Sequence, residues 1–251
     1  MRTVKQLLDL TGRRALVTGG AGCIGRAVCD ALRECGATVT SLDRNPKSCD
    51  LACDLSKEDS TRAAVRKAAA RMGGLDILVH CAAFVGDTKL SGWAVPFRKQ
   101  TVAAWDQALR VNLTSAFTLV QEARPHLEKS GRGSIVLFSS IYGLVGPDFS
   151  LYKGTSMANP AGYGASKGGL LQLTRCLSTG LAPKVRVNAI SPGGVLRGQP
   201  ASFRRRYQAR TPLGRMAVEE DLKGAAAYLA SDASAYVTGQ NLVVDGGWTA
   251  W

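Results

Sequence analysis

Short apolar runs alternate along the chain with longer segments in which apolar residues recur at helical spacing. Runs with so few polar positions are typical of strands buried on both faces of a parallel sheet, and the intervening segments favour helices that cover it. The predicted strands are 14–18, 38–42, 75–79, 133–138, 185–190 and 241–244, with a short one before residue 54; the predicted helices are one ending at 35 and those at 57–72, 102–109, 114–129, 164–181 and 219–229. We therefore predict an α/β fold with a doubly wound parallel sheet of about seven strands and helices on both faces, in a single domain spanning residues 1–251.

The first predicted strand runs into a glycine-rich turn, Gly19 to Gly25, and a helical pattern follows. This arrangement is typical of a dinucleotide site, because glycine lets the main chain approach the diphosphate and the helix N-terminus offers N–H groups. Asp43 follows the second strand, where a carboxylate can accept hydrogen bonds from the adenosine ribose. The same carboxylate would repel a 2′-phosphate, so NAD is favoured over NADP, while Arg44 beside it keeps NADP open.

Tyr163 and Lys167 lie four residues apart in a predicted helix, which puts both side chains on one face. A cation beside a phenol stabilises the phenolate and lowers a pKa that is ordinarily about 10. Such a tyrosine can take a proton from an alcohol. The spacing alone is common on helices, so its meaning depends on the rest of the chain.

Eight motifs in order resemble the short-chain dehydrogenase/reductases, in their compact single-domain branch, from about Gly12 to the C-terminus. The motifs are the Thr18-Gly19…Gly25 turn, Asp54-Leu55, the strand 75–79, Asn112 in Val-Asn-Leu, Ser139-Ser140, the Tyr163/Lys167 pair, Ser191-Pro-Gly-Gly194 and Asp245-Gly-Gly247. The resemblance implies a Rossmann-type sheet and hydride transfer between a nicotinamide and a secondary alcohol or ketone.

The resemblance also implies residue roles. Tyr163 would be the general acid/base, and Lys167 would bind the nicotinamide ribose and lower the tyrosine pKa. Ser140 would hydrogen-bond the substrate oxygen, and Asn112 would hold a water in a proton relay. The remaining implied cofactor contacts are Gly19, Gly22, Cys23, Ile24, Gly25, Asp43, Arg44, Asp54, Leu55, Cys81, Ala82, Ala83, Pro192, Gly193 and Val195.

The chain departs from the family pattern at three of these places. Cys23 stands where the compact branch usually has a glycine, and the spacing can also be read as that of the extended branch; the length and the C-terminal motifs favour the compact branch. His80-Cys-Ala-Ala83 replaces the usual Asn-Asn-Ala-Gly, and His80 fits a contact with the cofactor edge as well as a structural role. Arg197 replaces a threonine, so a contact with the carboxamide cannot be carried over.

The longest departure is the segment 142–160, which makes the interval from Ser140 to Tyr163 longer than is usual in the family. It is rich in Gly, Ser and Pro, which favours a loop. Because it lies between two catalytic residues, we predict a wall or lid of the substrate pocket, with Tyr152 as a substrate contact. Ser150 is a rival for the catalytic serine, but Ser140 is favoured because it ends a predicted strand.

The formal net charge is +13, which is compatible with a solvated basic surface. Arg204, Arg205 and Arg206 follow the Pro-Gly motif, where the family places its substrate-covering segment. Guanidinium groups there would suit a phosphate or carboxylate on the substrate, or the triplet forms one exposed helix face. No nucleic-acid-binding module is recognisable, and no metal site is predicted; His126 is expected at the surface or in packing.

Within the family, the chain is most similar to a subgroup associated with bacterial surface-polysaccharide and flagellin-glycan sugar synthesis. The residues that carry this similarity are 152–157, 191–194 with Gln199-Pro200, 211–216 and the ending 245–251. The expected substrate is a polar or anionic sugar derivative. An NADPH-dependent 3-ketoacyl-carrier-protein-type reductase and a non-catalytic NAD-binding regulator are the alternatives.

No stretch is apolar and long enough to cross a bilayer, and no signal-like core is found at the N-terminus. Seven scattered cysteines favour reduced cytosolic thiols over a disulfide framework, which predicts a cytoplasmic protein. The resemblance implies a homotetramer or homodimer. Trp248 and Trp251 are expected to pack at the subunit interface rather than against a sugar.

Overall fold

A seven-stranded parallel sheet forms the centre of the computed structural model, which describes residues 1–85 and 88–251. The strands are β1 (Arg14–Thr18), β2 (Thr38–Asp43), β3 (Leu51–Ala52), β4 (Ile77–His80), β5 (Gly133–Phe138), β6 (Val185–Pro192) and β7 (Asn241–Val244). They are ordered β3-β2-β1-β4-β5-β6-β7, and each neighbouring pair is parallel. The strand order reverses between β1 and β4, so the predicted doubly wound sheet is confirmed.

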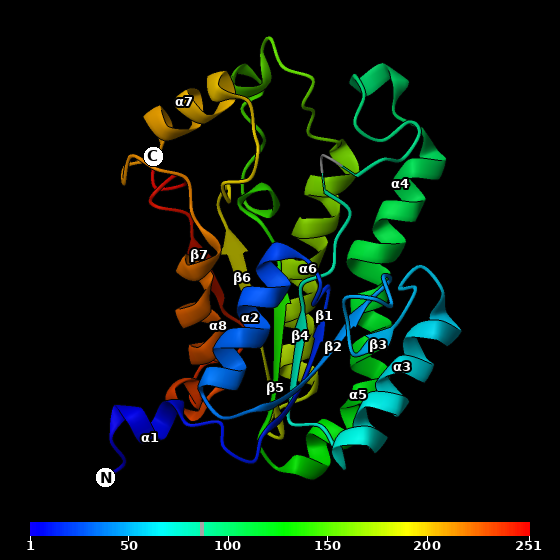
Figure 1. Cartoon of the computed structure of the whole chain (residues 1–251), viewed down its shortest axis with the longest axis vertical. Coiled ribbons are helices and arrows are strands. Elements are labelled where there is room, and N and C mark those ends of the chain that lie inside the picture. Colours follow the sequence, from blue (N-terminus) through cyan, green and yellow to red (C-terminus); the bar gives the residue numbers. More distant parts are fainter. Residues whose placement is uncertain (86–87) are drawn as a thin grey trace.

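Helices cover both faces of the sheet (Figure 1). The helices are α1 (Val4–Leu8), α2 (Cys23–Glu34), α3 (Glu58–Met72), α4 (Val102–Leu109), α5 (Ser115–Ser130), α6 (Ala161–Gly180), α7 (Ala201–Arg210) and α8 (Lys223–Ala230). On one face α2 packs against α8, and on the other α3 packs against α5 and α4 against α6. The predicted helices are confirmed, whereas α1 was not predicted. Arg204, Arg205 and Arg206 lie on helix α7.

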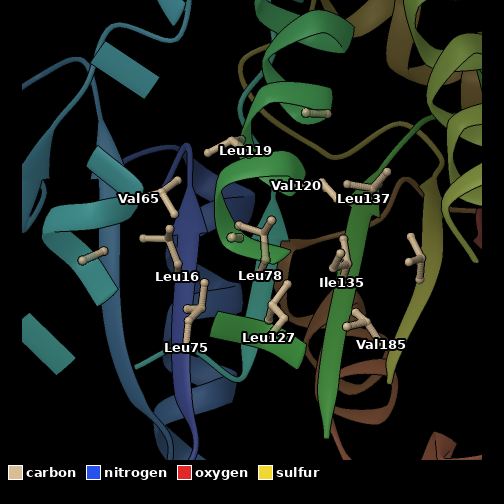
Figure 2. Close-up of a cluster of buried hydrophobic side chains, with 14 of the residues drawn as sticks. Leu16, Val65, Leu75, Leu78, Leu119, Val120, Leu127, Ile135, Leu137 and Val185 are labelled. Atoms are coloured by element: carbon tan, nitrogen blue, oxygen red, sulfur yellow. The ribbon is translucent and has the colours of Figure 1, made fainter. Parts of the chain in front are cut away.

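Two apolar cores lie on the two faces of the sheet, which explains why the strands carry so few polar residues. One core joins α3, α5 and α6 to the sheet; Leu16, Leu78 and Ile135 project into it beside Leu119 and Leu127 (Figure 2). The other core includes Val17, Val79 and Val136 and packs under α2 and α8. All six residues of β5 are buried.

A third apolar cluster lies beyond the carboxyl ends of the strands, where α7 and the segment before α6 lie together near the C-terminus (Figure 1). It joins Leu151 of the long segment to Phe203 and Tyr207 of α7 and to Trp248. The segment 142–160 is mainly loop, as predicted, with a 3₁₀ turn at Phe149–Tyr152. Among the residues at 1–85 and 88–251, no helix is both long and apolar enough to span a membrane.

Candidate active site

A cavity of about 570 Å³ opens where the strand order reverses, at the carboxyl ends of β1 and β4. Open α/β sheets bind ligands at this switch point, because the connections after the two neighbouring strands diverge to opposite faces there. Twelve of the residues predicted to contact the cofactor line this one cavity: Gly19, Gly22, Cys23, Ile24, Gly25, Asp43, Arg44, Asp54, Leu55, Cys81, Ala82 and Ala83.

The turn between β1 and α2 requires glycine at two positions for steric reasons. Gly19 has a φ of +67°, and a Cβ atom there would lie 2.7 Å from Ala82 Cα. At Gly25 a Cβ atom would lie 2.0 Å from the Gly19 carbonyl oxygen. Cys23, which replaces a glycine of the family pattern, is exposed in the first turn of α2 and is tolerated there.

The N-terminus of α2 fits the diphosphate of a dinucleotide. Its N-cap is Gly22, and no side chain caps the first turn of the helix. The N–H groups of Cys23 and Ile24 therefore face a cavity that both residues line, at the positive end of the helix dipole. No cluster of His, Cys, Asp and Glu suited to a metal ion occurs among the residues that the structure describes.

Asp43 ends β2 and lines the same cavity, where a carboxylate would meet an adenosine ribose. Its carboxylate accepts a hydrogen bond from the Ala21 N–H at 3.1 Å, which ties it to the glycine turn. The exposed Arg44 lines the same cavity. The Asp43 carboxylate and the Arg44 guanidinium thus belong to neighbouring residues at the place where the 2′-phosphate of NADP would distinguish it from NAD.

Ser140, Tyr163 and Lys167 come together because α6 packs against the end of β5. The Ser139 hydroxyl donates to the Lys167 carbonyl at 2.8 Å, and Lys167 Nζ donates to the Phe138 carbonyl at 2.7 Å. Lys167 is buried, with its Nζ 5.8 Å from the Tyr163 ring centroid. Ser140 is buried directly after β5, whereas the rival Ser150 is exposed in the loop.

Burial raises the pKa of Tyr163, while the Ser140 side chain opposes that rise. The Lys167 ammonium group is directed to the Phe138 carbonyl, and its effect on the tyrosine pKa stays a prediction. Burial also lowers the pKa of Lys167 to about 8. Among the groups around Tyr163, the Ser140 side chain contributes most to lowering its pKa and so to stabilising the phenolate.

Asn112 lies in a π-helical turn, Arg110–Thr114, between α4 and α5. Its side chain accepts from the Phe84 N–H at 2.6 Å and donates to the Phe84 carbonyl at 3.1 Å and the Ser166 hydroxyl at 3.0 Å. The amide thereby fixes the loop after β4 to α6. The proton-relay role of Asn112 stays a prediction.

His80 is fully buried at the end of β4 and does not line the cavity. Its Nδ1 lies 2.8 Å from the Thr18 hydroxyl of the neighbouring strand β1. Burial lowers its pKa to about 3. The sequence allowed either a contact with the cofactor edge or a structural role for His80, and its buried position favours the structural role. The residues that follow it, Cys81 to Ala83, line the cavity.

The predicted substrate residues lie around the long loop and α7. The Tyr152 hydroxyl is 3.0 Å from the Tyr142 hydroxyl and 3.5 Å from Asn159 Nδ2. Arg206 donates to the Leu151 carbonyl, so its guanidinium holds the loop, whereas Arg204 and Arg205 are exposed on α7. Pro192, Gly193 and Val195 were predicted to contact the cofactor. Pro192 is the last residue of β6 and the other two lie just after it, but none of the three lines the cavity.

Several lining residues of the cavity were not predicted from the sequence. They are Leu42, Cys53, Ser56, Phe84, Val85, Thr88, Gln107, Val111 and Arg197. Phe84, Val85 and Thr88 come from the loop after β4, and Gln107 comes from α4, where no sequence signal marks them. For Arg197 the sequence did give a sign of a special role, since this arginine replaces a threonine in an otherwise matching motif.

Comparison with known proteins agrees with this geometry. Residues 19–249 match the family described as enoyl-(acyl carrier protein) reductase. The chain is 37% identical to a cis-4-hydroxycyclohexanecarboxylate dehydrogenase of Sinomonas cyclohexanicum, over 95% of this chain and 97% of the relative. It is 35% identical to a probable galactose dehydrogenase of Rhizobium meliloti, over 96% of this chain and 97% of the relative.

Solved structures match over nearly the whole chain. A gluconate 5-dehydrogenase from Burkholderia cenocepacia, in complex with NADP and tartrate, has a TM-score of 0.86 and 28% identity, covering 99% of this chain and 100% of that one. A short-chain dehydrogenase from Leptospira borgpetersenii with bound NAD⁺ has a TM-score of 0.85 and 31% identity, covering 99% and 96%. The chain therefore belongs to the short-chain dehydrogenase/reductase family and is an NAD(P)-dependent oxidoreductase that acts on CH–OH groups.

Proposed function

We propose that this enzyme uses NAD to interconvert a secondary alcohol and a ketone on a polar or anionic cyclic substrate, of the class of a sugar derivative. The observation that carries the proposal is the grouping of Ser140, Tyr163 and Lys167 beyond the end of β5, at the carboxyl edge of the same sheet that holds the cofactor cavity. This grouping provides a proton donor, a second hydroxyl and a cation around one point.

In this mechanism Tyr163 moves the proton of the substrate hydroxyl. The Ser140 hydroxyl hydrogen-bonds the same substrate oxygen, so both groups stabilise the negative charge that develops there. Lys167 keeps a cation behind the tyrosine, and α6 fixes the spacing of the two side chains. The nicotinamide would supply or accept the hydride.

The preference for NAD rests on Asp43. Its carboxylate is held by the Ala21 N–H at the ribose end of the cavity, where a 2′-phosphate would meet a negative charge. Arg44 offers the opposite charge but is exposed, whereas Asp43 is half-buried. Electrostatic repulsion by the less solvated carboxylate should therefore dominate.

The substrate class rests on the polar groups near Tyr163. The charge interaction with Tyr152 is one of the causes that raise the pKa of Tyr163. The paired hydroxyls of Tyr142 and Tyr152, with the Asn159 amide, could bind substrate hydroxyl groups. Relatives named for a hydroxycyclohexanecarboxylate and for galactose support a ring that carries polar or anionic groups.

Nicotinamide absorbance would test the proposal with a panel of sugars, sugar phosphates, nucleotide-sugars, hydroxycyclohexanecarboxylates, neutral alcohols and a β-ketoacyl thioester. NAD and NADP would be compared for each compound, with Tyr163→Phe as the background. We expect the largest kcat/KM with NAD and a polar or anionic ring. NADPH-dependent turnover confined to the thioester would overturn the proposal and favour the carrier-protein reductase, a function that the relative from Thermotoga maritima bears by name.

A further inference from the structure

Arg197 lies on the wall of the cofactor cavity and has no role in the proposed reaction. It follows β6 and lines the same cavity as Gly22 and Cys23 at the start of α2. The glycine turn and Arg197 belong to segments that lie far apart in the sequence. The cavity therefore combines a helix N-terminus with a guanidinium from a different part of the fold.

The main chain around Arg197 is fixed on two sides. Val195 pairs with Ala217 in a parallel bridge, and the Leu196 N–H donates to the Ala217 carbonyl at 2.8 Å. The Arg197 N–H donates to the Gln199 side chain at 2.6 Å, and that side chain donates to the Val195 carbonyl at 2.8 Å. The arginine side chain therefore starts from a well-anchored segment, which reduces the entropy lost when it binds a ligand.

The guanidinium of Arg197 remains available to a ligand. Its side chain is 38% exposed, and Nε lies 3.9 Å from a Glu219 carboxylate oxygen, farther than a hydrogen bond. Because a guanidinium has five N–H donors in a planar fork, this contact leaves donors for an anion. Its positive charge also lowers the pKa of Tyr163.

We propose that Arg197 is a cofactor-positioning residue that binds the diphosphate of the dinucleotide from the side of the cavity opposite the N-terminus of α2. Main-chain N–H groups of α2 would hold one side of the diphosphate, and the arginine fork would hold the other. A planar guanidinium binds phosphate oxygens in pairs, which a threonine at this position cannot do. The adenosine and nicotinamide ends of the cofactor would then be held by separate groups.

Equilibrium binding without substrate would test this role. We would titrate NADH, ADP and adenosine into the wild-type protein, Arg197→Ala and Arg197→Lys, with Arg175→Ala as a matched control, since Arg175 is exposed on α6 and does not line the cavity. Arg197→Ala is expected to weaken NADH and ADP about tenfold to a hundredfold, the range for hydrogen bonds to charged groups. Arg197→Lys should recover part of the loss, and adenosine should be affected least.

Unchanged ADP and NADH affinities in Arg197→Ala would overturn the proposal. An equal loss for adenosine and ADP would also overturn it, because the substitution would then act on the adenosine end. If only the substrate KM rose, Arg197 would be a substrate residue and the proposal would again fail. Since the titrations need no turnover, their failure leaves the proposed reaction and substrate class untouched.

Discussion

At Tyr163, burial and the Ser140 side chain act in opposite directions on the acidity of the phenol. Burial favours the neutral form, and the Ser140 side chain favours the phenolate. Lys167 is itself buried, and its lowered pKa of about 8 shows the energetic cost of keeping an ammonium group there. The two side chains share a helix face, but the direction of each pKa shift comes from the packing around that face.

Tyr163→Phe should lower kcat by at least about a hundredfold, because the ring is retained and the proton donor is lost. The dissociation constant for NADH should stay close to that of the wild type, since Tyr163 does not line the cofactor cavity. Stopped-flow turnover and fluorescence titration would measure the two quantities. Near-wild-type turnover would contradict the assignment of Tyr163 as the acid/base.

His80 should make the folded state sensitive to acid. Its pKa is about 3 in the folded protein and about 6.5 ordinarily, and both burial and the Lys167 charge oppose its protonation. Below pH 6.5 the unfolded chain takes up a proton that the folded chain does not. Folding stability is therefore complete above pH 6.5 and falls as the pH drops towards 3.

Replacement of His80 should remove this acid sensitivity. Between pH 6.5 and 4, the free energy of unfolding of the wild type should fall relative to His80→Asn by up to about 1.4 kcal/mol per pH unit. Chemical denaturation at several pH values would measure it. His126→Gln, at the other histidine, is the control, and parallel pH profiles for wild type and His80→Asn would refute the interpretation.

Among the elements, α7 and the loop 142–160 are joined by contacts of several kinds. Tyr152 packs on Phe203, with ring centroids 5.3 Å apart, and Arg210 forms an ion pair with Asp148. Arg206 donates to two loop carbonyls, those of Leu151 and Lys153. The loop is therefore held by the helix that follows the Pro-Gly motif, so the two elements would move together if the pocket opens.

Arg206→Met should loosen the loop while retaining the apolar stem of the side chain. Loss of its charged hydrogen bonds should cost about 1–3 kcal/mol of local stability. Hydrogen exchange should accelerate at the amides of 142–160, and Arg205→Met on the exposed side of α7 should leave that exchange unchanged. Identical exchange in the two variants would show that Arg206 does not hold the loop.

For the whole molecule, we expect assembly into a homotetramer or homodimer. Large apolar side chains stay exposed in α4 and α5 and just before α4, among them Phe97, Val102 and Phe117. Burial of such side chains favours association. The C-terminal tryptophans differ: Trp248 is buried within its own chain and stacks on Tyr207, whereas Trp251 is 75% exposed and is available for an interface.

Sedimentation velocity at micromolar concentration would measure the assembly state. A mass of two or four times 26.5 kDa is expected, and it should persist at high salt if apolar contacts hold the subunits together. A monomer over the whole concentration range would refute the prediction. Dissociation by salt alone would instead assign the contacts to the many surface charges.

The sequence by itself determined the fold class and most of the cofactor cavity. Continuous apolar strands can be buried only in a sheet covered on both faces, and glycines at 19 and 25 are required by contacts within one local turn. The apolar strands and the turn glycines depend on residues close by in the chain, so local sequence patterns can predict them. Asp43, Tyr163 and Lys167 were found in the same way, from their places at a strand end or on one helix face.

Only the tertiary structure decided the surroundings of these residues. Arg197, in the segment after β6, lines one cavity with the start of α2, and Arg206 turns to the loop because α7 packs on it. The raised pKa of Tyr163 and the burial of His80 likewise depend on segments far apart in the chain. Burial, charge and hydrogen bonding act through distance in space, and the order of residues alone does not specify those distances.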